Sequence, residues 1–139
     1  MKRVEAWPQL LAAYIEERRH APFAWGVNDC GLFAADWVQL ATGIDIALPF
    51  RGKYDSALSA AHLLREFGGI AASLEAVGQS CGMEMIDASR CSRGDLLVRN
   101  NGRGDAIGIQ LGNCSAFVAR EGLVFAPMAA LDSARCWRI

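Results

Sequence analysis

The sequence changes character after Gly82, and this change constrains the fold more than any other feature of the chain. Before Gly82, apolar residues recur with helical spacing. After it, short runs rich in Leu, Val, Ile and Phe alternate with tight polar turns, which is typical of strands. Adjacent short strands joined by short turns favour an antiparallel sheet, and helices that bury one face can cover it. We therefore expect an α+β fold, with N-terminal helices on a C-terminal curled antiparallel sheet of about five or six strands.

Spacing and capping signals predict four helices before Gly82, within one domain of residues 1–139. In the second of these, apolar residues run nearly all round and Gly43 stops the helix, so it should be the buried core element. The expected helices extend from near Pro8 to the charged cluster at residues 16–19, from Cys30 to about Ala41, from about Ser56 to Phe67, and over residues 71–77.

Six short segments after Gly82 are strand candidates. Asparagine and glycine residues at 100–104 predict a hairpin turn between the second and third of them, and residues 120–122 predict another turn. The expected strands cover residues 83–86, 95–98, 106–111, 116–119, 123–125 and 136–139.

Charge and cysteine usage exclude several classes of function. The net charge of −1 comes from 14 basic and 15 acidic residues scattered along the chain, so no nucleic-acid-binding surface is expected. The five cysteines are odd in number and form no C-x-x-C pair, so we expect neither a zinc site nor a disulfide framework, and no cofactor. The N-terminus lacks the pattern of a signal peptide and no long apolar run follows, which predicts cytoplasmic synthesis without membrane insertion.

Cys30 stands where a loop is expected to become the central helix. The first N–H groups of a helix carry the positive end of its dipole, so they favour a thiolate over a thiol. Asn28 or Asp29 would cap this helix, but a carboxylate at Asp29 would also raise the thiol pKa. Trp25 would flank any groove beside the thiol. Cys30 is therefore either the position of a nucleophile or a small buried residue at a helix start.

A nucleophilic thiol needs a general base, and the chain has only two histidines, His20 and His62. His20 precedes Cys30 in a loop that can fold back, which makes it a candidate base; the alternative is a solvated histidine at the end of the first helix. His62 lies inside a predicted helix, where we expect a partly buried packing residue.

Three segments together resemble the NlpC-type branch of the papain-like cell-wall peptidases. They are residues 28–32 (Asn-Asp-Cys-Gly-Leu), 93–98 (Arg-Gly-Asp-Leu-Leu-Val) and 105–112 (Asp-Ala-Ile-Gly-Ile-Gln-Leu-Gly). In that family a strand histidine takes the thiol proton, and a polar residue on the following strand orients the imidazole. The resemblance aligns Ala106 with the histidine and, through residues 122–127, Phe125 with the orienting residue. Neither side chain can accept a proton.

The chain is still more similar to a small group of NlpC-like proteins encoded among the tail genes of phages and prophages. That resemblance is carried by the Asp-Cys helix start, the Ala-x-Gly-Ile strand and the ending Trp137-Arg138-Ile139. It implies a catalytically degenerate structural or assembly component that binds a tail hub or tip protein and is incorporated in the virion tail.

Two other functions stay open. One is an active cysteine hydrolase that cleaves peptidoglycan peptide amides, with Cys30 as nucleophile and His20, His62 or a partner chain as base. The other is a binding module that holds a peptidoglycan peptide in the groove near Trp25 and Cys30 without cutting it.

Overall fold

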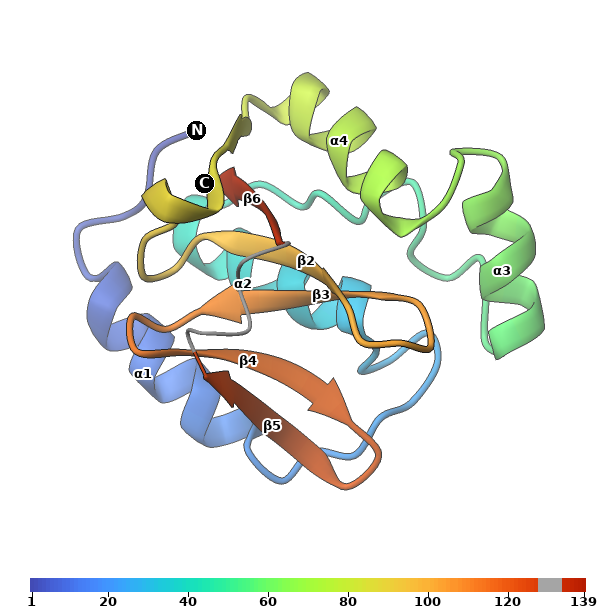
Figure 1. The fold of residues 1–139 in the computed structure, drawn as a ribbon, viewed down its shortest axis with the longest axis horizontal. Helices are drawn as coiled ribbons and strands as arrows, with labels where there is room; N and C mark the ends of the chain where they lie inside the picture. The colour runs from blue at the N-terminus through green and yellow to red at the C-terminus, as the bar shows by residue number, and fades with distance from the viewer. Residues whose placement is uncertain (128–133) are drawn as a thin grey trace.

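The computed structural model describes residues 1–127 and 134–139, and within them it shows the expected α+β fold (Figure 1). Four α-helices precede the sheet: α1 (Trp7–Arg18), α2 (Cys30–Thr42), α3 (Ala57–Arg65) and α4 (Ile70–Cys81). The strands are β1 (Glu84–Ile86), β2 (Leu96–Asn100), β3 (Asp105–Gln110), β4 (Cys114–Ala119), β5 (Gly122–Pro127) and β6 (Arg135–Arg138), and a short 3-10 helix, Ala88–Arg90, follows β1.

All the strands belong to one antiparallel sheet with the order β1-β6-β2-β3-β4-β5. The last strand therefore returns to lie between β1 and β2, which brings the two ends of the described chain together at one side of the molecule (Figure 1). The Met1 amino group donates a hydrogen bond to the Gly82 carbonyl at 3.3 Å, and the Arg3 Nε donates one to the Ile139 carbonyl at 3.2 Å.

The main core lies between the sheet and the helix α2, which passes behind the sheet in Figure 1. Phe33 and Trp37 of α2 are completely buried, and the adjacent α1 contributes Leu11 and Tyr14. The opposite face of the sheet carries a smaller apolar cluster of Ile86, Leu97, Phe117, Ala126 and Cys136. Hydrophobic burial on both faces fixes the register, because a shift by one residue would exchange the two sets.

Two glycines are required in and next to the sheet, one by a close contact between strands and one by the turn before β2. A Cβ at Gly108 would lie 2.6 Å from the Phe117 ring on the neighbouring strand, so only glycine fits there. The turn before β2 places Gly94 at φ 93°, and its carbonyl accepts a hydrogen bond from the indole of Trp37 at 2.8 Å. The Arg-Gly-Asp segment thus has a structural role, since it ties the entrance of β2 to the central helix.

The predicted elements are confirmed, with differences at their ends. Ser56 caps α3, and Gly43 in the left-handed conformation ends α2, as their residue types indicate. The helix expected over 71–77 extends to Cys81, where Gly82 ends it. No helix among the described residues is long and apolar enough to cross a membrane.

Candidate functional site

The loop that leads to Cys30 is a tight turn held by its own backbone. The Ala24 and Asn28 backbones bond to each other in both directions, at 3.1 and 2.8 Å. Gly26 sits at φ 76°, and a Cβ there would lie 2.5 Å from the Tyr54 carbonyl oxygen. Glycine is therefore required both by the backbone conformation and by the close approach of the Tyr54 segment. This packing sets the position at which α2 begins.

Asp29 is the cap of α2 and the centre of a small hydrogen-bond cluster. Its carboxylate accepts bonds from the backbone N–H of Leu32 at 2.9 Å and of Gly26 at 3.0 Å, and a third from the Tyr54 hydroxyl. Burial, and then the bond to Asp29, raises the pKa of Tyr54, so this hydroxyl stays protonated and donates. The sequence left the cap open between Asn28 and Asp29, and the structure assigns it to Asp29.

Asn28 has a different role, because its side chain holds the loop back toward α1. Its amide donates to the carbonyls of Ala21 and Pro22, and it accepts a bond from Arg18 at 3.1 Å. Arg18 also pairs with Asp36 of α2 at 2.9 Å. The Asp36 carboxylate is partly buried, with Arg18 on one side and Arg51 on the other.

The same carboxylate connects α2 to the loop that carries Tyr54. Arg51 pairs with Asp36 at 2.6 Å and with Asp45 at 2.7 Å. Although burial of Asp45 raises its pKa, the bonds from Arg51 and the Ala47 backbone, with the Arg51 charge, hold that pKa below its usual value. The loops before and after α2 are thus both fastened to its first two turns.

Cys30 is the first residue of α2, and its thiol is held in the neutral form. Burial raises the pKa of the Cys30 thiol, and the neighbouring Asp29 charge raises it further. Hydrogen bonds from the backbone of Ile107 and Gly31 oppose this rise without cancelling it. The helix dipole therefore does not produce a thiolate here, because loss of hydration outweighs it.

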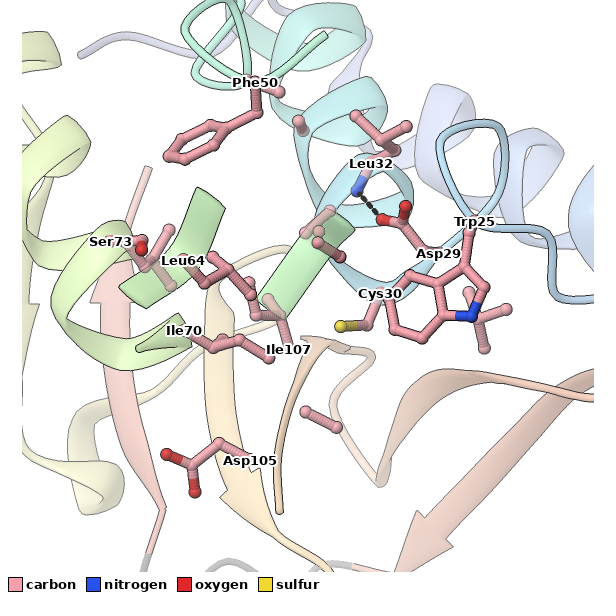
Figure 2. Close-up of a pocket in the computed structure, with 18 of the residues that line it drawn as sticks. Trp25, Asp29, Cys30, Leu32, Phe50, Leu64, Ile70, Ser73, Asp105 and Ile107 are labelled. Atoms are coloured by element: carbon pink, nitrogen blue, oxygen red, sulfur yellow. Dashed lines mark hydrogen bonds between the residues drawn. The ribbon is translucent and has the colours of Figure 1, made fainter. Parts of the chain in front are cut away.

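The thiol opens onto a cavity of about 610 Å³ (Figure 2). The sulfur points into it beside the ring of Trp25, and Phe50, Leu64 and Ile70 lie across from it (Figure 2). The wall is formed by α2, α3, α4, the loop between α2 and α3, and the beginning of β3. Trp25 flanks this cavity as predicted and is 40% exposed.

The positions where the resemblance requires a base and an orienting group hold apolar side chains. Ala106, at the start of β3, is among the residues that line the cavity with Cys30, and it also packs against the smaller apolar cluster on the other face of the sheet. The strand that follows is β4, and its Val118 lines the same cavity. Phe125 was aligned with the orienting residue, but it lies on β5, one strand further, and stacks under Arg19 with the guanidinium carbon 5.2 Å from its ring centre. The prediction for Phe125 is therefore wrong, and Val118 is the residue placed at the cavity.

Neither histidine lines the cavity. His20 is exposed in the turn after α1, where it borders a separate hollow with Arg19, Gly122 and Phe125. This is the solvated placement at the end of the first helix, and the structure does not bring His20 to the Cys30 cavity. His62 was expected to be partly buried, but it is exposed on α3, because this helix buries only Ala60.

No group of three or more His, Cys, Asp or Glu side chains within residues 1–127 and 134–139 is arranged to hold a metal ion. All five cysteines are free. Cys136 is buried, and its thiol contacts that of Cys91 on the sheet face away from α2. Cys30, Cys81, Cys91 and Cys114 are only partly buried.

Sequence reasoning missed Tyr54 and the wall formed by α3 and α4. Tyr54 follows Gly52 in a loop without periodicity, so nothing in the sequence connects it with Asp29, 25 positions earlier. The apolar residues of α3 and α4 have helical spacing, and that spacing does not tell whether they pack against each other or enclose a space.

No curated protein matches this chain. The sequence model of one family does match it, over residues 2–139, and that family is described as "Domain of unknown function (DUF6950)". The matched range includes the cap of α2, Cys30, Ala106 and Val118, so the cavity lies within the part of the chain that the family model covers. The chain belongs to the DUF6950 family.

Proposed function

We propose that this protein is a catalytically degenerate NlpC-like domain that serves as a structural or assembly component of a phage or prophage tail. The tail context comes from the sequence resemblance. The loss of catalysis is supported by one observation: the Cys30 thiol faces a cavity where the base and orienting positions are Ala106 and Val118.

A cysteine hydrolase needs a thiolate and a group that shuttles its proton. Burial raises the pKa of Cys30, and both histidines lie outside the cavity lining. Loss of a general base alone lowers rates by about 10²–10⁴-fold. The contacts that hold the loops against α2 are all present. They are the Asp29 cap, the bond from Tyr54 to Asp29 and the two arginine pairs with Asp36. These contacts stabilise the loops around the start of α2, and a structural role of this region does not require a reaction at Cys30.

The thiol can be tested directly in the purified protein. Alkylation of Cys30 by iodoacetamide, followed at the Cys30 peptide by mass spectrometry across a pH series, should give an apparent pKa above the ordinary value of 9.0. Incubation with peptidoglycan peptides should release no more product than the Cys30→Ala variant does. An apparent pKa below about 6.5 would contradict an inert thiol, and turnover that disappears in Cys30→Ala would establish a hydrolase instead.

The tail assignment requires a genetic test. In a phage or induced prophage that carries this gene, deletion should abolish or shorten tails seen by electron microscopy. Both the wild-type gene and Cys30→Ala should restore them. Normal tails after deletion would overturn the assembly role, and failure of a folded Cys30→Ala protein to restore tails would show that the thiol itself is needed.

A further inference from the structure

The cavity beside Cys30 is lined mainly by apolar side chains. Its inner end is formed by buried residues of two helices, Ala35 of α2 and Leu74 and Val77 of α4. Its outer wall is α3, and Leu64 of this helix lies beside Ile70 on the side of the space opposite Cys30 (Figure 2). A volume of about 610 Å³ falls within the range of about 300–1,000 Å³ that small-molecule sites occupy.

Away from the β2–β3 hairpin at its rim, the polar side chains Ser73, Tyr54 and Asp29 of this cavity are already bonded within the protein. The Ser73 hydroxyl donates to the Gly69 carbonyl at 2.6 Å, and the Tyr54 hydroxyl donates to Asp29. The Asp29 carboxylate also accepts two backbone bonds. A peptide entering this space would give up hydrogen bonds to water without replacing them, which is costly for each amide group. A hydrocarbon chain has no such groups to desolvate.

A positively charged side chain, that of Arg103, lies at the rim of the cavity. The hairpin between β2 and β3 contributes Asn101, Arg103 and Asp105 to the lining. Arg103 is exposed, and none of the ion pairs formed among the described residues includes it. Asp105 accepts a hydrogen bond from the Asn100 amide at 3.3 Å. An anionic head group at the rim would pair with Arg103 and would be opposed by Asp105.

We propose that the cavity binds a fatty acid, with the aliphatic chain directed toward Leu74 and Val77 and the carboxylate at Arg103. This inference does not depend on the tail assignment, because it follows from the cavity lining and the rim charge alone. Binding is non-covalent. The aliphatic chain of the ligand would pass Cys30, whose neutral thiol adds to the apolar lining.

Isothermal titration tests whether the aliphatic part of the ligand enters the cavity. The ligands are saturated fatty acids from octanoate to hexadecanoate, each below its micelle concentration. Every added methylene that enters the cavity should tighten Kd about fourfold, until the cavity is filled and the gain stops. Dodecanol should bind more weakly than dodecanoate. Absence of saturable binding, or an affinity that does not change with chain length, would overturn the proposal.

Two sets of variants localise the ligand. Ala61→Trp on α3 places a large side chain at the cavity wall, and the exposed Ala13→Trp on α1 is its matched control outside the lining. Only Ala61→Trp should weaken dodecanoate binding. At the rim, Arg103→Gln should weaken it about two- to fivefold and Asp105→Asn should tighten it, as expected for exposed charge pairs. Equal effects of the two tryptophan variants, or no effect of either rim variant, would contradict this placement.

Cys30 supplies a readout that does not depend on any variant. Bound dodecanoate should slow the alkylation of Cys30 and leave the rate at Cys114 unchanged, because Cys114 lies outside the cavity lining. A peptidoglycan peptide added at the same concentration should not protect Cys30. Protection by the peptide and not by the fatty acid would overturn the proposal in favour of a peptide-binding groove.

Discussion

The Asp95 carboxylate, only 1% exposed, forms an ion pair with Arg3 at 2.5 Å, although the two residues are 92 positions apart. Arg3 also donates to the carbonyls of Arg93 and Ile139, and its guanidinium carbon lies 4.4 Å from the ring centre of Trp7. One side chain thus joins the N-terminal segment, the entrance of β2 and the last residue. The contact explains why an otherwise peripheral segment is fixed to the sheet.

Asp95→Ala should be strongly destabilising. It leaves the partly buried Arg3 without its counter-charge, which typically costs about 3–5 kcal/mol, and removes the acceptor of the Ser92 N–H. Urea unfolding followed by circular dichroism measures the loss. The control is Glu16→Ala, which breaks the exposed pair between Glu16 and Arg19 and should cost less than about 1 kcal/mol. Equal losses in the two variants would contradict a special role for the Arg3 pair.

Gly26→Ala should disturb the loop before Cys30. Gly26 and Gly52 have nearly the same backbone angle, φ 76° and 74°, but only at Gly26 would a Cβ meet the Tyr54 carbonyl, at 2.5 Å. Gly52→Ala therefore measures the conformational strain alone, about 1 kcal/mol, and Gly26→Ala should cost about 1–3 kcal/mol more. The difference in the free energy of unfolding between the two variants isolates the contact with Tyr54.

Much of the fold could be predicted from local signals. Gly43 and Gly82 end their helices in the left-handed conformation, and Ser56 begins one, so helix boundaries depend on single residues. The strands could be placed because turn residues separate them. Which strand contacts which helix is a property of the whole chain, and this is where the alignment of Phe125 failed. The strand that directly follows β3 is β4, whose apolar sequence is similar to that of β5. Its residue Val118, and not Phe125 of β5, lines the cavity.

The chemistry of the site could be predicted only in part. The sequence indicated the cap, the influence of Asp29 on the thiol and the lack of a base at Ala106, since these are neighbours in the chain or in a motif. It did not predict the cavity, because Leu64, Ile70 and Leu74 are ordinary core residues by composition. Only the arrangement of α3 and α4 shows that they enclose a space.

Asp29→Asn should lower the pKa of Cys30 while leaving it above its ordinary value. Burial is the larger cause of the raised pKa and persists in the variant, whereas the charge of Asp29 is removed. Asparagine keeps a cap oxygen for Leu32. The midpoint of Cys30 alkylation with pH measures the change, and the exposed Asp55→Asn is the control. An unchanged midpoint would show that Asp29 does not act on the thiol.

The raised pKa of Cys30 also predicts how stability depends on pH. The folded protein holds the thiol proton more tightly than the unfolded chain, whose pKa lies near the ordinary value of 9.0. The resulting stabilisation is complete below that value and is lost as pH rises through the folded pKa. The free energy of unfolding should therefore fall with pH above about 9, less steeply in Cys30→Ala than in the wild type. Parallel curves for the two proteins would contradict this.

Ala106→His tests whether the site lacks only its base. If the Ala106 position faces the thiol as the shared cavity lining indicates, an imidazolium there would stabilise the thiolate and lower the Cys30 pKa. Alkylation of Cys30 at neutral pH should then accelerate, since the thiolate is the reacting form. Ala119→His is the control, because Ala119 is also partly exposed at the end of a strand but lies outside this cavity. Equal rates in both variants would mean that position 106 is not the one from which a base would reach Cys30.

Acceleration of Cys30 alkylation in Ala106→His without peptide hydrolysis would show that restoring the histidine is not sufficient for peptidase activity, and that the apolar cavity also separates this protein from an active peptidase.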